Sequence, residues 1–95
     1  MKQELLEKNY EILEHYGFDR QAIVWIEELS ELTKEICKRL RKGCFTDLMD
    51  IKGEVNDAQV CLDQIKKAIG FEADEQEEYY KFKVNRQLER IQKGE

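Results

Sequence analysis

Apolar residues recur along the chain at intervals of three and four, separated by polar and charged residues. This period is typical of amphipathic α-helices, and no segment shows the strict alternation expected of a strand. Three glycines, Gly17, Gly43 and Gly70, divide the pattern where helices commonly end. The pattern therefore predicts an all-α fold with four helices, at about residues 2–16, 20–42, 47–69 and 75–93.

Only a few residues separate these helices, so consecutive helices are expected to lie side by side and antiparallel. We therefore expect an antiparallel four-helix bundle in a single domain covering residues 1–95. Three polar residues are expected to cap helix N-termini, namely Asp19, Thr46 and Asp74.

Composition adds limits on size and partners. A chain of 95 residues buries somewhat over 60% of its unfolded surface, so its stability alone is expected to be marginal and oligomerisation would help. The net charge of −5 argues against DNA or RNA as a partner. No apolar run approaches the roughly 18 residues that span a bilayer, and no signal peptide is evident.

The chain contains three cysteines, Cys37, Cys44 and Cys61, without C-x-x-C spacing. An odd number without that spacing predicts free thiols in a reducing cytoplasm rather than disulfides or a structural zinc site. The expected location is therefore cytoplasmic, without a membrane partner.

Each central helix combines an apolar stripe with an acidic one. The acidic stripes are Glu28, Glu31 and Glu35 in residues 20–42, and Asp50, Glu54 and Asp57 in residues 47–69. The apolar stripes are Ala22, Trp25, Ile26, Leu29, Leu32, Ile36 and Leu40, and Leu48, Ile51, Val55, Ala58, Leu62, Ile65 and Ile69.

The acidic stripes admit two interpretations. They are either solvated outer faces, or converging carboxylates that bind a divalent cation. Val24 and Cys61 fall among the acids, which indicates that other parts of the protein partly cover the stripes. Covered carboxylates repel one another and then take up protons or bind a hard cation such as Mg²⁺, Mn²⁺ or Ca²⁺.

The acidic residues form the sequence Glu27-Glu28-Leu29-Ser30-Glu31, followed by Glu54-Val55-Asn56-Asp57. This E-E-x-x-E and E-x-x-D pair resembles the MazG-type nucleotide pyrophosphohydrolases of the all-α NTP pyrophosphatase superfamily, which includes the dimeric dUTPases. The match covers residues 19 to about 69. One departure is Asn56, where many members carry glycine.

The resemblance implies a hydrolase that uses Mg²⁺, with Mn²⁺ as a possible substitute, to convert a nucleoside triphosphate to a monophosphate and pyrophosphate. It implies Glu28, Glu31, Glu54 and Asp57 as metal ligands and Glu27 and Glu28 as catalytic residues. It also implies a homodimer or homotetramer with a MazG-type fold.

The last helix carries Lys83, Arg86 and Arg90 on one side, similar to the basic C-terminal helix of compact family members. Lys83 and Arg86 would then bind substrate phosphates, although a solvated face paired with nearby glutamates is the alternative. Gln21 would bind substrate near the base or sugar. A different class of function is a non-catalytic helical interaction module that retains the fold.

Overall fold

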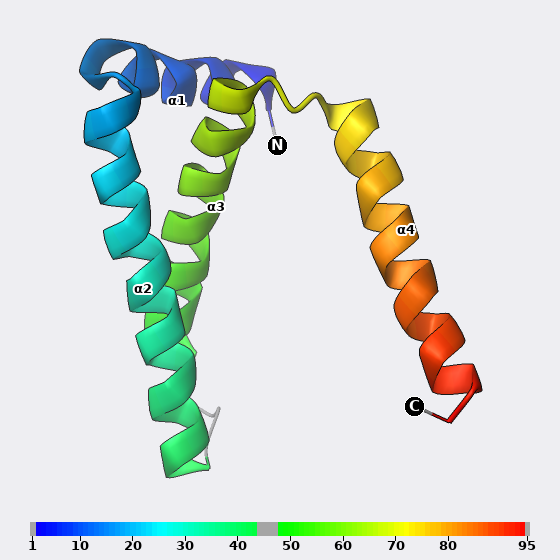
Figure 1. Ribbon diagram of the computed structural model, residues 1–95. Coiled ribbons are helices and arrows are strands. Elements are labelled where there is room, and N and C mark those ends of the chain that lie inside the picture. The colour runs from blue at the N-terminus through cyan, green and yellow to red at the C-terminus, as the bar shows by residue number, and fades with distance from the viewer. Residues whose placement is uncertain (1, 44–47, 95) are drawn as a thin grey trace.

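The computed structural model describes residues 2–43 and 48–94 (Figure 1). Those residues form four helices and no strand, which confirms the all-α prediction. The helices are α1 (Gln3–Tyr16), α2 (Phe18–Lys42), α3 (Met49–Ile69) and α4 (Ala73–Gln92). None of them, over the described residues, is long and apolar enough to cross a membrane.

The two longest helices, α2 and α3, lie side by side and run in opposite directions (Figure 1). α1 crosses the end of this pair where α2 begins and α3 ends, and it contacts both helices. Three of the four helices therefore pack together. The expected N-cap Thr46 lies outside the described residues.

A single residue, Gly17, separates α1 from α2 and turns the chain sharply. Its backbone has φ 84° and ψ 166°, a region that is essentially restricted to glycine. The prediction that Asp19 caps α2 is wrong, because α2 begins at Phe18 and Asp19 lies in its first turn. The prediction for Asp74 is also wrong, since Glu72 occupies the N-cap position of α4.

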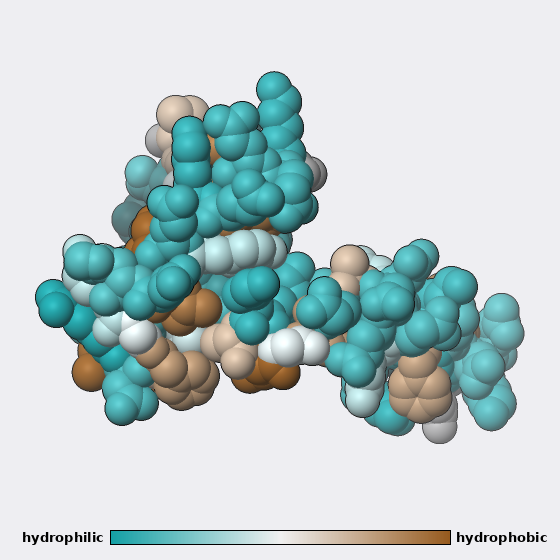
Figure 2. All heavy atoms as spheres, turned by 90° about the horizontal axis from the view of Figure 1, so that it is seen from above, coloured by the Kyte–Doolittle hydropathy of each residue, from teal (hydrophilic) through white to brown (hydrophobic). Residues whose placement is uncertain are grey.

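The interior is small and unusually polar. Within residues 2–43 and 48–94, the buried apolar residues are Trp25, Ala58 and Cys61, whereas the buried polar ones are Gln21, Arg39, Asp63 and Gln64. Ile26 and Leu40 of the predicted apolar stripe are 67% and 68% exposed. Figure 2 shows apolar side chains at the surface among hydrophilic ones. The single chain thus leaves much of its apolar surface uncovered.

A chain of amide hydrogen bonds joins the three packed helices. Oε1 of Gln64 on α3 accepts hydrogen bonds from Nε2 of Gln21 at 3.1 Å and Nε1 of Trp25 at 2.8 Å. Its Nε2 donates to Oδ1 of Asn9 on α1 at 2.7 Å, and Asn9 in turn donates to the backbone oxygen of Val60 at 3.0 Å. These bonds fix the positions of α1, α2 and α3 relative to one another.

The fourth helix stands apart from the other three (Figure 1). Only its first turns are attached, through a 3.1 Å hydrogen bond from Lys66 to Gln76 and an edge-on contact between Phe71 and Tyr79. The radius of gyration is 16.3 Å, compared with about 13 Å for a compact domain of 100 residues. Within this chain α4 does not complete the expected four-helix bundle.

Candidate acidic site

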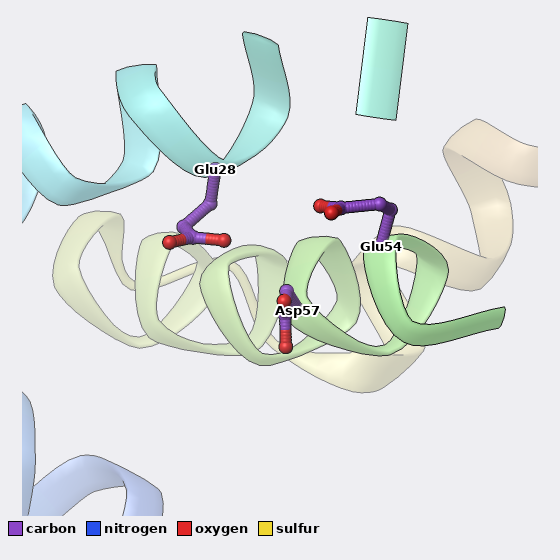
Figure 3. A group of neighbouring side chains, drawn as sticks. All are labelled: Glu28, Glu54 and Asp57. Carbon is purple, nitrogen blue, oxygen red and sulfur yellow. The ribbon is translucent and has the colours of Figure 1, made fainter. Parts of the chain in front are cut away.

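Three carboxylates from α2 and α3 converge between the paired helices. One oxygen each of Glu28, Glu54 and Asp57 lies within 4.8 Å of the other two, and we call these residues the acid cluster (Figure 3). Glu54 and Asp57 share a side of α3 because they are three residues apart. Glu28 projects toward them from α2. The antiparallel pairing therefore brings both halves of the motif together.

The carboxyl group of Glu54 is partly buried and lies among other acids. Burial raises the pKa of its carboxyl group above the ordinary value of 4.5, and the charges of Asp57, Glu31, Glu28 and Glu35 raise it further. Its Oε2 atom is buried and accepts no hydrogen bond from the described part of the chain. A buried carboxylate oxygen ordinarily has a partner, and a proton or a cation would supply one for this atom.

The other acids of α2 lie at the margin of the cluster. Glu31 is exposed, and its carboxylate lies 3.7 Å from the ammonium group of Lys34. Glu35 accepts a 3.0 Å hydrogen bond from Nε of Arg39, whose Nη2 lies 3.9 Å from a carboxylate oxygen of Asp50. Arg39 is only 7% exposed and forms the cationic end of the acidic face.

A cavity of about 240 Å³ adjoins the cluster on the side nearer α1. Its lining combines Glu28 and Asp57 with Gln64 and three apolar residues, Val24, Val60 and Cys61. Burial, followed by the charges of Glu28 and Asp57, raises the pKa of the Cys61 thiol. The acids therefore border a partly apolar recess, as the positions of Val24 and Cys61 in the sequence indicated.

The remaining predicted site residues do not join the cluster in this chain. Glu27 is exposed on α2, and the amide of Gln21 is buried in its hydrogen bond to Gln64. Lys83 and Arg86 are exposed on α4, which does not approach the acids (Figure 1). The structure thus unites Glu28, Glu54 and Asp57, leaves Glu31 beside them, and keeps the predicted phosphate-binding residues elsewhere.

Sequence reasoning missed three residues that support the site. Asn9 and Gln64 were not singled out, because amides are common at protein surfaces and carry no characteristic spacing. Arg39 lies four residues after Glu35, and that helical ion-pair spacing was a signal that could have identified it.

Compared with protein-family models, with curated proteins and with solved structures, the chain matches none of them. The function is therefore inferred from the geometry and chemistry of the acid cluster, together with the resemblance of its motif. The cluster itself provides hard oxygen ligands from two helices and no soft or imidazole ligand.

Proposed function

We propose that this protein is an Mg²⁺-dependent nucleoside triphosphate pyrophosphohydrolase of the MazG type, which releases a nucleoside monophosphate and pyrophosphate. One observation carries the proposal. Motif residues that are far apart in the sequence, Glu28 on α2 and Glu54 and Asp57 on α3, place carboxylate oxygens within 4.8 Å of one another. Like charges at this separation repel one another, and a bound cation would remove that repulsion.

The residues of the cluster suit a hard divalent cation. All three offer carboxylate oxygens, which Mg²⁺ and Mn²⁺ prefer. The unpartnered Oε2 atom of Glu54 is the kind of buried acceptor that such a cation would satisfy. Mg²⁺ usually keeps several waters and uses few carboxylates, so three converging side chains are sufficient.

Glu28, Glu54 and Asp57 would hold the ion, and Glu31 would join them by releasing its exposed contact with Lys34. When bound, Mg²⁺ supplies charge neutralisation for the phosphates and activation of a water nucleophile. Glu27, exposed on the neighbouring side of α2, would orient that water and accept its proton. Asp57 and Val60 would border the substrate at the rim of the adjoining cavity.

The MazG-type bundle and its assembly as a homodimer or homotetramer form part of this proposal. Exposed apolar residues on α2 and α3, among them Ile26, Leu40, Val55 and Ile69, provide surface that a second copy could bury. A small domain, with three buried apolar residues among those that the structure describes, gains more from such burial than a large one. These features support an oligomer of helical bundles.

A panel of ribo- and deoxyribonucleoside triphosphates, incubated with and without Mg²⁺, tests the proposed reaction. Monophosphate and pyrophosphate should appear together in equal amounts, and only with the metal. Glu54→Gln should remove nearly all turnover, whereas Glu78→Gln, on the detached helix α4, should leave it unchanged. Orthophosphate with accumulating diphosphate would contradict the proposal, as would equal activity in Glu54→Gln. Inactivity toward the whole panel would favour the non-catalytic module.

A further inference from the structure

The side chain of Arg39 lies between acidic residues of both paired helices. Its Nε atom donates a 3.0 Å hydrogen bond to Glu35 on α2, and its Nη2 atom lies 3.9 Å from a carboxylate oxygen of Asp50 on α3. Among the ion pairs of the described residues, the one with Asp50 alone connects two helices. Arg39 is buried, and we call it, together with Glu35 and Asp50, the arginine bridge.

The arginine bridge repeats the arrangement of the acid cluster about two helical turns away. Glu28, Glu35 and Arg39 fall within about 20° of one another around α2, at 100° per residue. Asp50 and Asp57 share a side of α3 in the same way. Seven residues separate the two acids on each helix, which corresponds to about 10 Å along the helix axis. Both groups therefore combine acids from α2 with acids from α3.

The two groups differ in what neutralises their carboxylates. No ion pair of the described residues includes Glu28, Glu54 or Asp57, and Oε2 of Glu54 is buried without a partner. In the arginine bridge a guanidinium group stands between the acids. Arginine keeps its positive charge throughout the physiological pH range, and its planar set of donors suits carboxylates. The acid cluster can therefore accept a cation, whereas the arginine bridge already contains one.

The acids of the two groups influence one another. The charge of Glu35 is among those that raise the pKa of Glu54, so the negative potential extends from one group to the other. Without Arg39, a divalent cation entering between α2 and α3 would meet carboxylates in both groups, because Mg²⁺ and Mn²⁺ accept any such oxygen ligands. The contact with Arg39 at 3.0 Å occupies Glu35 and removes it from that competition.

We propose that Arg39 is an internal counter-ion that takes the place of a divalent cation between Glu35 and Asp50 and thereby confines metal binding to the acid cluster. This inference deepens the proposed function, since it names the residue that limits how many ions the acidic face binds. Arg39 acts through Glu35 and not on substrate, so it is a positioning residue. Loss of its charge should create a second metal site in the arginine bridge.

Electron paramagnetic resonance of Mn²⁺ counts bound ions and tests this role without reference to activity. The acid cluster is first disabled by Asp57→Asn, and this single variant should bind no ion because Arg39 still neutralises Glu35. Asp57→Asn/Arg39→Met should bind one Mn²⁺ per chain, held by Glu35 and Asp50. Asp57→Asn/Arg39→Lys should bind none, because lysine keeps the positive charge. Circular dichroism checks folding, and Arg39→Gln, whose amide can still donate to Glu35, replaces Arg39→Met if that variant unfolds.

Two further variants locate the new site. Adding Glu35→Gln to Asp57→Asn/Arg39→Met should remove the bound ion. Lys34→Met in the Asp57→Asn chain is the matched control, because Lys34 forms an exposed ion pair with Glu31 at 3.7 Å on the same helix. It should bind no ion. An ion bound by the Lys34 variant, or retained after Glu35→Gln, would overturn the specific role of Arg39.

The counter-ion and the proposed function fail on different results. If wild type binds no Mn²⁺ while Asp57→Asn/Arg39→Met binds one, the metal site of the acid cluster is refuted and the role of Arg39 is supported. If wild type binds Mn²⁺ but Asp57→Asn/Arg39→Met and its Arg39→Gln counterpart bind none, the acid cluster is supported and the counter-ion is refuted. Equal binding by Asp57→Asn with and without Arg39 would also refute the counter-ion.

Discussion

The indole Nε1 of Trp25 donates a 2.8 Å hydrogen bond to Oε1 of Gln64, and this bond joins α2 to α3 one turn from Glu28. Gln21 donates to the same oxygen, and Gln64 donates onward to Asn9. Because Gln64 is only 3% exposed, solvent cannot replace these bonds easily. The buried amide therefore fixes the register that brings Glu28 opposite Asp57.

Gln64→Leu should lower the free energy of unfolding by about 1–3 kcal/mol, because it leaves buried donors on Gln21 and Trp25 without an acceptor. Urea unfolding followed by circular dichroism measures the loss. Gln87→Leu, at an exposed position of α4, is the control and should change stability little. Equal effects of the two substitutions would show that the amide network contributes nothing specific.

Glu54→Gln should stabilise the metal-free protein at neutral pH. The folded state raises the pKa of Glu54 above 4.5, so it holds the proton more tightly than the unfolded chain does. Stability is therefore lost as the pH rises from 4.5 through the raised pKa, and it returns as the pH falls. The advantage of the variant should be largest at pH 7 and disappear near pH 4.5, as followed by thermal melting in chelator. A variant less stable than wild type at pH 7 would contradict a raised pKa of Glu54 in the folded state.

Arg39→Met should lower the free energy of unfolding by about 3 kcal/mol, because it leaves the largely buried carboxylate of Glu35 without its 3.0 Å partner. The double variant Glu35→Gln/Arg39→Met should lose less than the single variant, since no unpaired charge remains. Urea denaturation of both proteins measures the difference. A double variant that loses as much stability as Arg39→Met, or more, would contradict coupling between the two side chains.

The positions of the helices could be predicted from local sequence. Gly17, Gly43 and Gly70 do end or separate the helices, and the boundaries differ from the predicted ones by at most two residues at the ends that the structure describes. The convergence of Glu28 with Glu54 and Asp57 was one of two interpretations of the acidic stripes, and the resemblance of the motif favoured it. The helical period and the spacing of the motif depend on residues that are close together in the sequence, so they can be recognised in a single sequence.

Which residues are buried could not be predicted from local sequence in the same way. Ile26 and Leu40 belong to the predicted apolar stripe but are exposed, whereas Gln64 and Arg39 are buried. Which side of a helix faces inward depends on the neighbour it meets, and beyond its first turns α4 packs against none of the described helices in this chain. The periodicity of apolar residues identifies the apolar side of a helix, but it does not show whether other residues of the same chain pack against that side.

Lys83→Ala and Arg86→Ala should each reduce kcat/KM roughly ten- to a hundredfold, the equivalent of a charge-assisted bond to phosphate worth about 1.5–3 kcal/mol. The loss should appear mainly in KM, because such contacts are similar in the ground and transition states. Lys81→Ala is the matched control on α4, since Lys81 lies on another side and pairs with Glu78. Steady-state kinetics that show equal losses at Lys81 would argue against specific phosphate contacts.

Calorimetric titration of Mg²⁺ into the protein without nucleotide tests the acid cluster most directly. Wild type should give a saturable binding heat, because Glu28, Glu54 and Asp57 offer converging carboxylates and Glu54 has a buried oxygen without a partner. Asp57→Asn should remove that heat, and Glu78→Gln on α4 should retain it. No saturable heat in wild type, or an unchanged isotherm in Asp57→Asn, would contradict a metal site formed by these three residues.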